Sequence, residues 1–260
     1  MSMKTWNKWS IRGGILTAGL VSAVAFVPGS NEGPGKVATE LQSDWKIEAT
    51  GARIIGGYGQ NFAYDGANVR DLIGKATVEL NFETGTGRVV AEVETTAQSG
   101  PIQFSSDQAW SGKIRIVQML NLDKMAAARM EKDVMLHGDT GNEAPVMPNI
   151  FNYFATWGPS SITVNGEEVI PMIGSHTMLS ERSRGVDGAI RNEAGMPYSP
   201  MAAVKSGFTD ASGIEFHVVA HTMQPDKGNF PPHTGWVHLN FGEVRIIASP
   251  DGEKIPYKGQ

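Results

Sequence analysis

Alternation of apolar and polar residues predicts strands in the second quarter of the chain. Residues 75–82 read KATVELNF and residues 88–96 read RVVAEVETT, with the five residues ETGTG between them. A period of two places alternate side chains on opposite faces of a sheet, and a glycine-bearing loop of this length is typical of a hairpin. Residues 113–120, KIRIVQML, alternate in the same way. We therefore predict an antiparallel meander in this part of the chain.

Two further strand pairs are predicted in the second half. Residues 161–164 and 167–170 flank an Asn-Gly dipeptide at 165–166. Asn-Gly between apolar runs favours a two-residue hairpin, because both residues tolerate positive φ. The other pair is formed by residues 213–221 (GIEFHVVAH) and 235–247 (GWVHLNFGEVRII).

Helix signals are few. Residues 123–132 (DKMAAARMEK) are the best candidate, with an aspartate as N-cap and a run of good helix formers. Residues 68–75 fit two helical turns, and residues 201–205 fit one. With about ten strands and one or two short helices, the chain is predicted to be mainly β. We expect a single antiparallel β-sandwich or barrel-like domain.

The first residues read as a leader. Lys4, Lys8 and Arg12 form a basic start, and an apolar run at 15–27 follows it, with Ala-Val-Ala at 23–25. A basic start, a short apolar run and small residues at a cleavage position are typical of a secretory signal peptide. The run is too short for a membrane span, which needs roughly 20 apolar residues. We expect residues 1–25 to be a signal peptide and the protein to be exported, either periplasmic or secreted.

The rest of the chain is expected to form one domain. Residues 26–44 are polar and rich in Gly and Pro, so we interpret them as a flexible linker. The β-rich domain is expected at 45–260, with two lobes at 45–120 and 150–250 as the alternative. No segment after the leader has the length and hydropathy of a membrane span.

The composition restricts the kinds of site and of partner that the protein can have. The chain has no cysteine, which excludes disulfides, thiolate metal sites and cysteine catalysis. The formal net charge is −5, which argues against nucleic acid as the main partner. No phosphate-binding glycine loop, serine nucleophile elbow or His-Glu-x-x-His zinc helix is present. We therefore expect a small ligand or a metal ion as partner and no nucleotide cofactor.

Apart from Met1 and Met3 in the leader, every histidine and methionine lies at or beyond residue 119, since residues 26–118 contain neither. The tripeptide His-Thr-Met occurs at 176–178 and again at 221–223. Imidazole and thioether are ligands for copper, and imidazole also suits zinc. Methionine is, however, a common filler of irregular core space, and this use explains the methionines equally well.

Strand geometry groups three of the histidines. One face of residues 214–221 carries Glu215, His217, Val219 and His221. One face of residues 236–241 carries Trp236, His238 and Asn240. If the apolar faces match in an antiparallel pair, one allowed register sets His221 opposite Trp236 and His238 opposite Val219. His217 and His221 would then both lie diagonally from His238, within reach of a shared ligand.

We therefore predict a metal site of His217, His221 and His238, with His176 as a fourth ligand and zinc or copper as the metal. The alternatives for this face are the solvated side of a half-buried hairpin and a polar ligand pocket without a metal. At the level of function, a metal-free, lipocalin-like binder of apolar ligands and a structural or adhesive envelope module stay open. Whether the protein is an enzyme is not decided by the sequence. Residues 157–159 and 228–233 place aromatic residues and a histidine where a binding mouth could form.

Overall fold

The computed structural model describes residues 43–59, 65–138, 140, 148–190, 210–226 and 231–250. The predicted signal peptide at 1–25, all but the last two residues of the predicted linker, and the predicted helical turn at 201–205 lie outside the described residues. Every described residue belongs to one compact unit that begins at residue 40.

Twelve strands are present in the described part of the chain. They are β1 (Trp45–Gly57), β2 (Arg70–Asp71), β3 (Ile73–Asn81), β4 (Thr86–Glu94), β5 (Ile102–Gln103), β6 (Ala109–Trp110), β7 (Lys113–Asn121), β8 (Arg129–Leu136), β9 (Ile150–Val164), β10 (Glu167–Arg182), β11 (Asp210–His221) and β12 (Trp236–Ala248).

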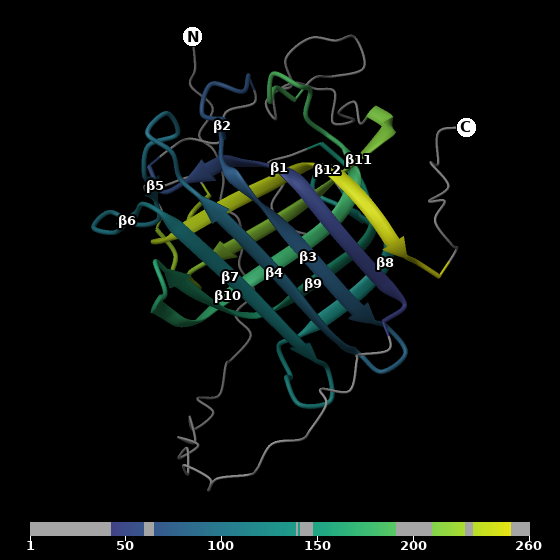
Figure 1. Cartoon of the computed structure of the whole chain (residues 1–260). Coiled ribbons are helices and arrows are strands. Elements are labelled where there is room, and N and C mark those ends of the chain that lie inside the picture. The colour runs from purple at the N-terminus through teal and green to yellow at the C-terminus, as the bar shows by residue number, and fades with distance from the viewer. Residues whose placement is uncertain are drawn as a thin grey trace, which may run out of the picture. The chain divides into compact units, whose positions relative to one another are not determined.

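Eight of these strands close into an antiparallel barrel (Figure 1). Each pairs with its neighbour in the order β1, β3, β4, β7, β9, β10, β11, β12, and β12 returns to pair with β1. Apart from β2, β5, β6 and β8, which lie outside the ring, the order in space is the order in the chain, so the topology is up-and-down. Closure leaves the ring without an unpaired edge. The prediction of a mainly β, barrel-like fold is confirmed, whereas the sandwich alternative is not supported.

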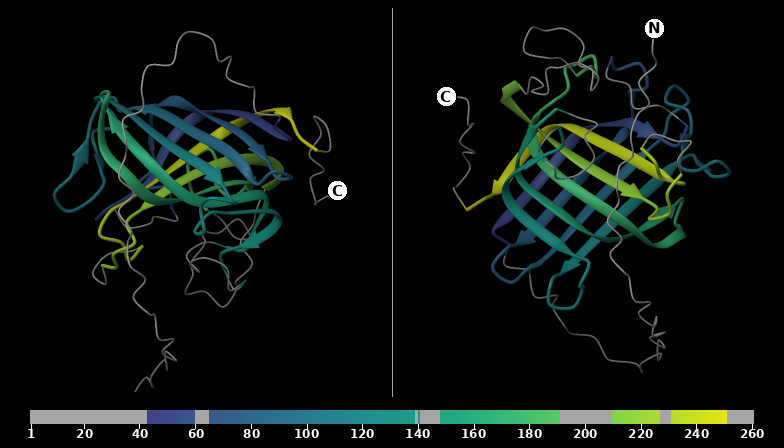
Figure 2. Two further views of the ribbon diagram at one scale, coloured as in Figure 1. Left: turned by 90° about the horizontal axis from the view of Figure 1, so that it is seen from below. Right: turned by 180° about the vertical axis from the view of Figure 1, so that it is seen from behind.

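Strand β9 is long enough to serve two partners on one edge (Figure 2). Its C-terminal part pairs with β7, which is a member of the ring. Its N-terminal part pairs with β8, which is not a member of the ring. Its other edge pairs with β10 along most of its length. The β9–β10 hairpin turns at Asn165 and Gly166, which have φ of 51° and 89°. This is the predicted Asn-Gly turn, and it joins strands much longer than the predicted ones.

The inward side chains fill the barrel. Trp45 of β1 packs edge-on against Phe154 of β9, with ring centroids 5.2 Å apart, although these strands are not neighbours in the ring. Phe154 also packs against Phe216 of β11, which contacts Phe241 of β12. These residues belong to one buried apolar cluster with the inward residues of the other strands. The interior is therefore a packed hydrophobic core.

The two helices predicted at 123–132 and 68–75 are wrong. Residues 122–128, between β7 and β8, form turns, with Met125 N–H donating to the Asn121 carbonyl, and β8 begins at Arg129. The guanidinium of Arg129 lies 3.8 Å from the Trp157 ring centroid. Helix propensity is a weak preference, and here pairing with β9 overrides it. Residues 70–71 pair with β1 as β2, and β3 starts at Ile73.

No helix occurs among the described residues, so none of them forms a helix capable of crossing a membrane.

Candidate functional site

Strands β10, β11 and β12 align their outward side chains in rows. In one row His176 pairs with Val219, and Val219 pairs with His238. His221 pairs with Trp236 one row away, so the register is the one expected from the apolar pattern. The next rows are formed by Met178, His217 and Asn240, and by Ser180 and Glu215.

This outward face is buried. The exposed fraction is 0% for Glu215 and Asn240, 2% for His217 and 6% for His238. The prediction of a solvated face is therefore wrong. The sequence pattern misses this because it identifies two faces of a sheet without revealing that both are covered.

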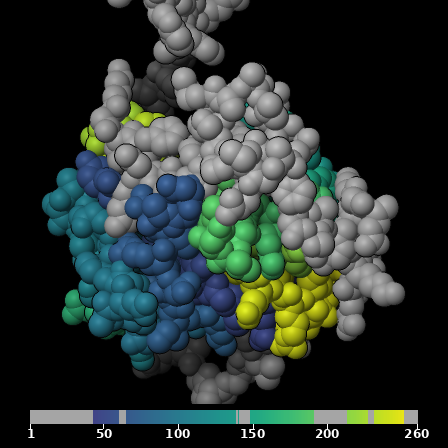
Figure 3. Space-filling view, turned by 90° about the horizontal axis from the view of Figure 1, so that it is seen from above, coloured from purple at the N-terminus to yellow at the C-terminus, as the bar shows by residue number. Residues whose placement is uncertain are grey.

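The segment 183–190, which follows β10, lies on this side of the barrel. Its Ser183 bonds Glu215, and its Gly185 carbonyl accepts a hydrogen bond from Arg53 of β1. Ala189 and Ile190 of this segment are themselves buried. In the view from above, its green surface lies between the blue surface of the segment that begins at residue 65 and the yellow surface of β12 (Figure 3).

Glu215, His217 and His238 form a chain of hydrogen bonds on this buried face. Nε2 of His217 lies 3.1 Å from Oε1 of Glu215, and Nδ1 of His217 lies 3.0 Å from Nε2 of His238. Both ring nitrogens of His217 are thus engaged between a carboxylate and a second imidazole.

Glu215 accepts hydrogen bonds from three donor groups of Ser183 and Asn240, besides its contact with His217. The backbone N–H and the hydroxyl of Ser183 donate to Oε1 at 2.8 and 2.6 Å. The side-chain amide of Asn240 donates to Oε2 at 2.9 Å, and Arg53 in turn donates to the amide oxygen of Asn240 at 2.9 Å. A carboxylate that accepts several hydrogen bonds is stabilised in its charged form.

The protonation states follow from these contacts. Burial acts most strongly on Glu215 and raises its pKa, but the charge and hydrogen bond of His217, together with the Ser183 donors, outweigh burial and lower the pKa to about 2. Burial lowers the pKa of His238 well below its ordinary value, and the electrostatic influence of His217 and Arg184 lowers it further. At neutral pH Glu215 is therefore a carboxylate and His238 is a neutral imidazole.

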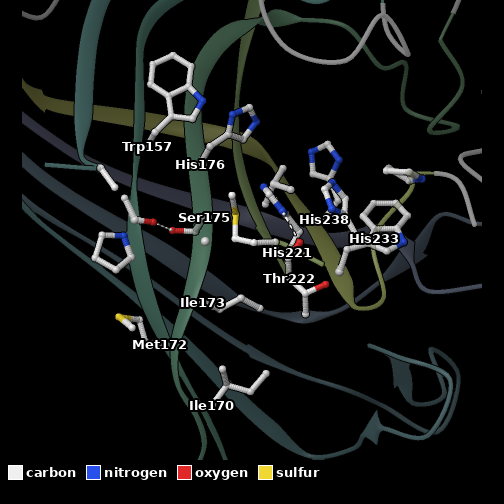
Figure 4. Close-up of a pocket in the computed structure, with 18 of the residues that line it drawn as sticks. Trp157, Ile170, Met172, Ile173, Ser175, His176, His221, Thr222, His233 and His238 are labelled. Carbon is white, nitrogen blue, oxygen red and sulfur yellow. Dashed lines mark hydrogen bonds between the residues drawn. The ribbon is translucent and has the colours of Figure 1, made fainter. Parts of the chain in front are cut away.

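A pocket of about 910 Å³ opens on the same face, outside the barrel. Five of the six histidines line it. The other lining side chains are mostly apolar and include Met172, Ile173 and Trp236. Figure 4 shows Ile170, Met172 and Ile173 toward one end and the labelled histidines toward the other. The described lining residues are Met125, Ala126, Ala127, His137, Trp157, Gly158, Pro159, Ile170, Met172, Ile173, Gly174, Ser175, His176, Met178, Val219, His221, Thr222, Met223, Gln224, Pro231, His233, Trp236 and His238.

His176 is a neutral side chain at the wall of this pocket. Its ring lies edge-on to Trp157 and to His137, with centroid distances of 5.8 and 6.2 Å. Burial, followed by the electrostatic influence of His137 and His221, lowers the pKa of His176 well below its ordinary value. Its buried Nδ1 has no hydrogen-bond partner among the described residues. A second uncharged imidazole therefore lies on the pocket wall in the same row as His238.

The four predicted metal ligands are divided among three environments. His217 and His238 are bonded to each other, while His176 packs against His137 and Trp157. His221 stacks on His233 at a centroid distance of 4.1 Å, and its Nδ1 lies 3.1 Å from the Thr222 carbonyl. Within the described part of the chain, no group of three or more His, Asp or Glu residues is placed to hold one metal ion. The metal site stays a prediction.

Sequence reasoning overlooked several residues of this site. His137 and Ser183 gave no signal of their own, because their roles depend on contacts between distant segments. His233 and Trp157 lie in segments that were expected to border a binding mouth, and both line the pocket. Arg184, which was not among the predicted site residues, is buried and donates to the Gly188 carbonyl.

The fold and the site together define the class of protein. It is an eight-stranded up-and-down antiparallel barrel with a buried carboxylate–histidine–histidine chain beside an external pocket. In comparisons with known proteins, no family model, no curated protein and no solved structure matches the chain.

Proposed function

We propose that this protein binds a small, predominantly apolar molecule in the pocket on the outer face of β9 to β12. The observation that carries the proposal is the pocket itself, about 910 Å³ in volume and lined mainly by methionine, isoleucine, tryptophan and histidine. This volume is within the range of about 300–1,000 Å³ found for small-molecule sites. The proposal keeps three of the four expected histidines, His176, His221 and His238, but assigns them to an organic ligand rather than to a metal ion.

The charge of the pocket wall supports a neutral ligand. No Asp, Glu, Lys or Arg occurs among the described lining residues. Burying an ion without a counter-charge is costly, and the neutral His176 and His238 supply none at neutral pH. The ligand is accordingly a neutral molecule whose apolar body fills the space beside Met172 and Ile173.

N-phenyl-1-naphthylamine, a neutral probe that fluoresces in apolar surroundings, tests the proposal. The full chain should bind it saturably at one site, with unchanged affinity in EDTA. V219F should weaken binding by more than about tenfold, because Val219 lies between His176 and His238 in the pocket wall and the larger ring fills the site. Titration of fluorescence against probe concentration measures both effects.

V186F is the matched control, because Val186 is 99% exposed and is not among the lining residues. It should bind the probe like the unaltered protein. G174F provides a second filler in case V219F unfolds, since a side chain at Gly174 would first meet the sulfur of the exposed Met223. Absence of saturable binding, or equal binding by folded V219F and G174F, would contradict the proposal.

A further inference from the structure

Thioether groups are concentrated at the pocket. Four of the described lining residues are methionines, namely Met125, Met172, Met178 and Met223. Met172 is 76% exposed and Met223 is 80% exposed, which makes them the two most exposed methionines among the described residues. Met178, in contrast, is buried. Two thioethers of the pocket are therefore open to small molecules in solution.

Both exposed methionines lie where a ligand in the pocket would cover them. Figure 4 shows Met172 with Ile173 toward the apolar end of the pocket. Met223 lies over Gly174, because a Cβ at that glycine would meet the Met223 sulfur at 3.2 Å. Gly174 pairs with His221 on the neighbouring strand, and both line the pocket. A molecule that fills the pocket therefore contacts both thioethers.

These thioethers can accept an oxygen atom. The chain has no cysteine, so methionine is the side chain that peroxides oxidise most readily. Hydrogen peroxide transfers one oxygen to the sulfur: the O–O bond breaks, an S–O bond forms, the sulfur loses two electrons and the peroxide is reduced to water. The product, methionine sulfoxide, is polar where the thioether is apolar. An apolar ligand offers the sulfoxide oxygen no hydrogen bond, so covering that oxygen is costly.

We propose that Met172 and Met223 are oxidation sites that control the pocket, because a peroxide that converts them to sulfoxides lowers the affinity of the pocket for its apolar ligand. This inference rests on the proposed function and adds a regulation of the same site. A bound ligand in turn covers both sulfurs and shields them from the peroxide.

Treatment of the full chain with hydrogen peroxide tests the proposal. Peptide mapping by mass spectrometry follows the oxidation of each methionine, and titration with N-phenyl-1-naphthylamine measures the affinity. Once Met172 and Met223 are oxidised, the affinity should fall by about tenfold or more. The near-UV circular dichroism should stay unchanged, which shows that the fold is retained.

A double variant with M172L and M223L removes both thioethers and keeps apolar side chains of similar volume. It should bind the probe like the unaltered protein and lose less than about twofold in affinity after peroxide treatment. The matched control is a double variant with M119L and M135L, since Met119 and Met135 are partly exposed and do not line the pocket. Its affinity should fall after peroxide treatment as much as that of the unaltered protein.

Protection by the ligand is a second measurement and needs no variant. At a saturating concentration of N-phenyl-1-naphthylamine, oxidation of Met172 and Met223 should slow several-fold, because few pockets are then empty. Met119 and Met135 should react at an unchanged rate, since the probe does not cover them.

The outcomes separate the two proposals. Equal affinity before and after oxidation of Met172 and Met223, a loss of affinity that persists in the M172L and M223L double variant, or no protection by the probe would overturn the oxidation inference and leave the pocket proposal standing. If the double variant does not fold, M172L and M223L are compared singly, and each should reduce the loss of affinity. Failure of the unoxidised chain to bind any apolar probe would refute the proposed function, and the oxidation inference with it.

Discussion

Glu215 keeps its charge inside the protein through fixed donors rather than through solvent. Ser183, Asn240 and His217 surround its two oxygens. Sequence patterning correctly places Glu215, His217 and Asn240 on one strand-pair face. It does not identify Ser183 as a partner, because that residue lies 32 positions from Glu215 and reaches it only through the fold. Local alternation predicts directions of side chains, and burial of this face depends on segments beyond the pair.

Acid should destabilise the protein in two stages. The pKa values of His176 and His238 are lowered below 6.5. The contribution of these neutral rings to the free energy of unfolding is therefore present above pH 6.5 and is lost as the pH falls below 6.5. The pKa of Glu215 is lowered from 4.5 to about 2, so its carboxylate contributes to the free energy of unfolding above pH 4.5. About 3 kcal/mol of this free energy is lost as the pH falls through the pKa of the folded state. Urea unfolding at pH 7, 5, 3.5 and 2.5 measures this decline.

E215Q should reduce the loss of stability below pH 4.5, which belongs to Glu215, and should leave the loss below pH 6.5, which belongs to His176 and His238. E167Q removes an exposed carboxylate at the start of β10 and serves as the matched control. A free energy of unfolding that stays constant from pH 5 to 2.5 in the unaltered protein would contradict the buried, ionised state of Glu215.

At the scale of elements, the inward apolar residues determine the register that builds the site. Phe216 and Val218 of β11 lie opposite Phe241 and Leu239 of β12, and their burial sets His238 beside Val219 on the other face. A one-residue slip would move every side chain to the opposite face. This is why the β11–β12 register is predictable from sequence, whereas β8 is not. Residues 129–136 show no clean alternation, and their strand form depends on pairing with β9.

Close contact between β1 and β12 supports the pocket wall. Gly56 of β1 pairs with His238, and a Cβ at Gly56 would overlap the indole ring of the buried Trp236. G56A should therefore destabilise the protein by about 1–3 kcal/mol through overpacking and change its tryptophan near-UV circular dichroism. Thermal and urea unfolding measure the loss.

G174A is the matched control for this substitution. Its added methyl group would meet the sulfur of Met223, an 80% exposed side chain, at 3.2 Å. We expect a change of less than about 0.5 kcal/mol, since an exposed flexible side chain can move aside. Equal stability of G56A and G174A would show that the close approach of Gly56 and Trp236 is not a constraint.

At the scale of the whole molecule, closure of the sheet decides where a ligand can bind. A sandwich and a barrel share the same alternation along each strand, so the pattern leaves both open. The distinction depends on pairing between β1 and β12, where bonded residues such as Arg53 and Asn240 lie 187 positions apart. Strands from both halves of the chain join one ring. The aromatic contacts across its interior place the pocket outside the ring, unlike the internal cavity expected of a lipocalin-like binder.

Intermolecular nuclear Overhauser effects between N-phenyl-1-naphthylamine and the isotope-labelled full chain test the central claim most directly. The probe should show contacts to Met172 and Ile173 at the apolar end of the pocket and to Val219 between His176 and His238. Contacts instead to inward core residues such as Leu239, or saturable binding without any contact to the pocket residues, would contradict the account.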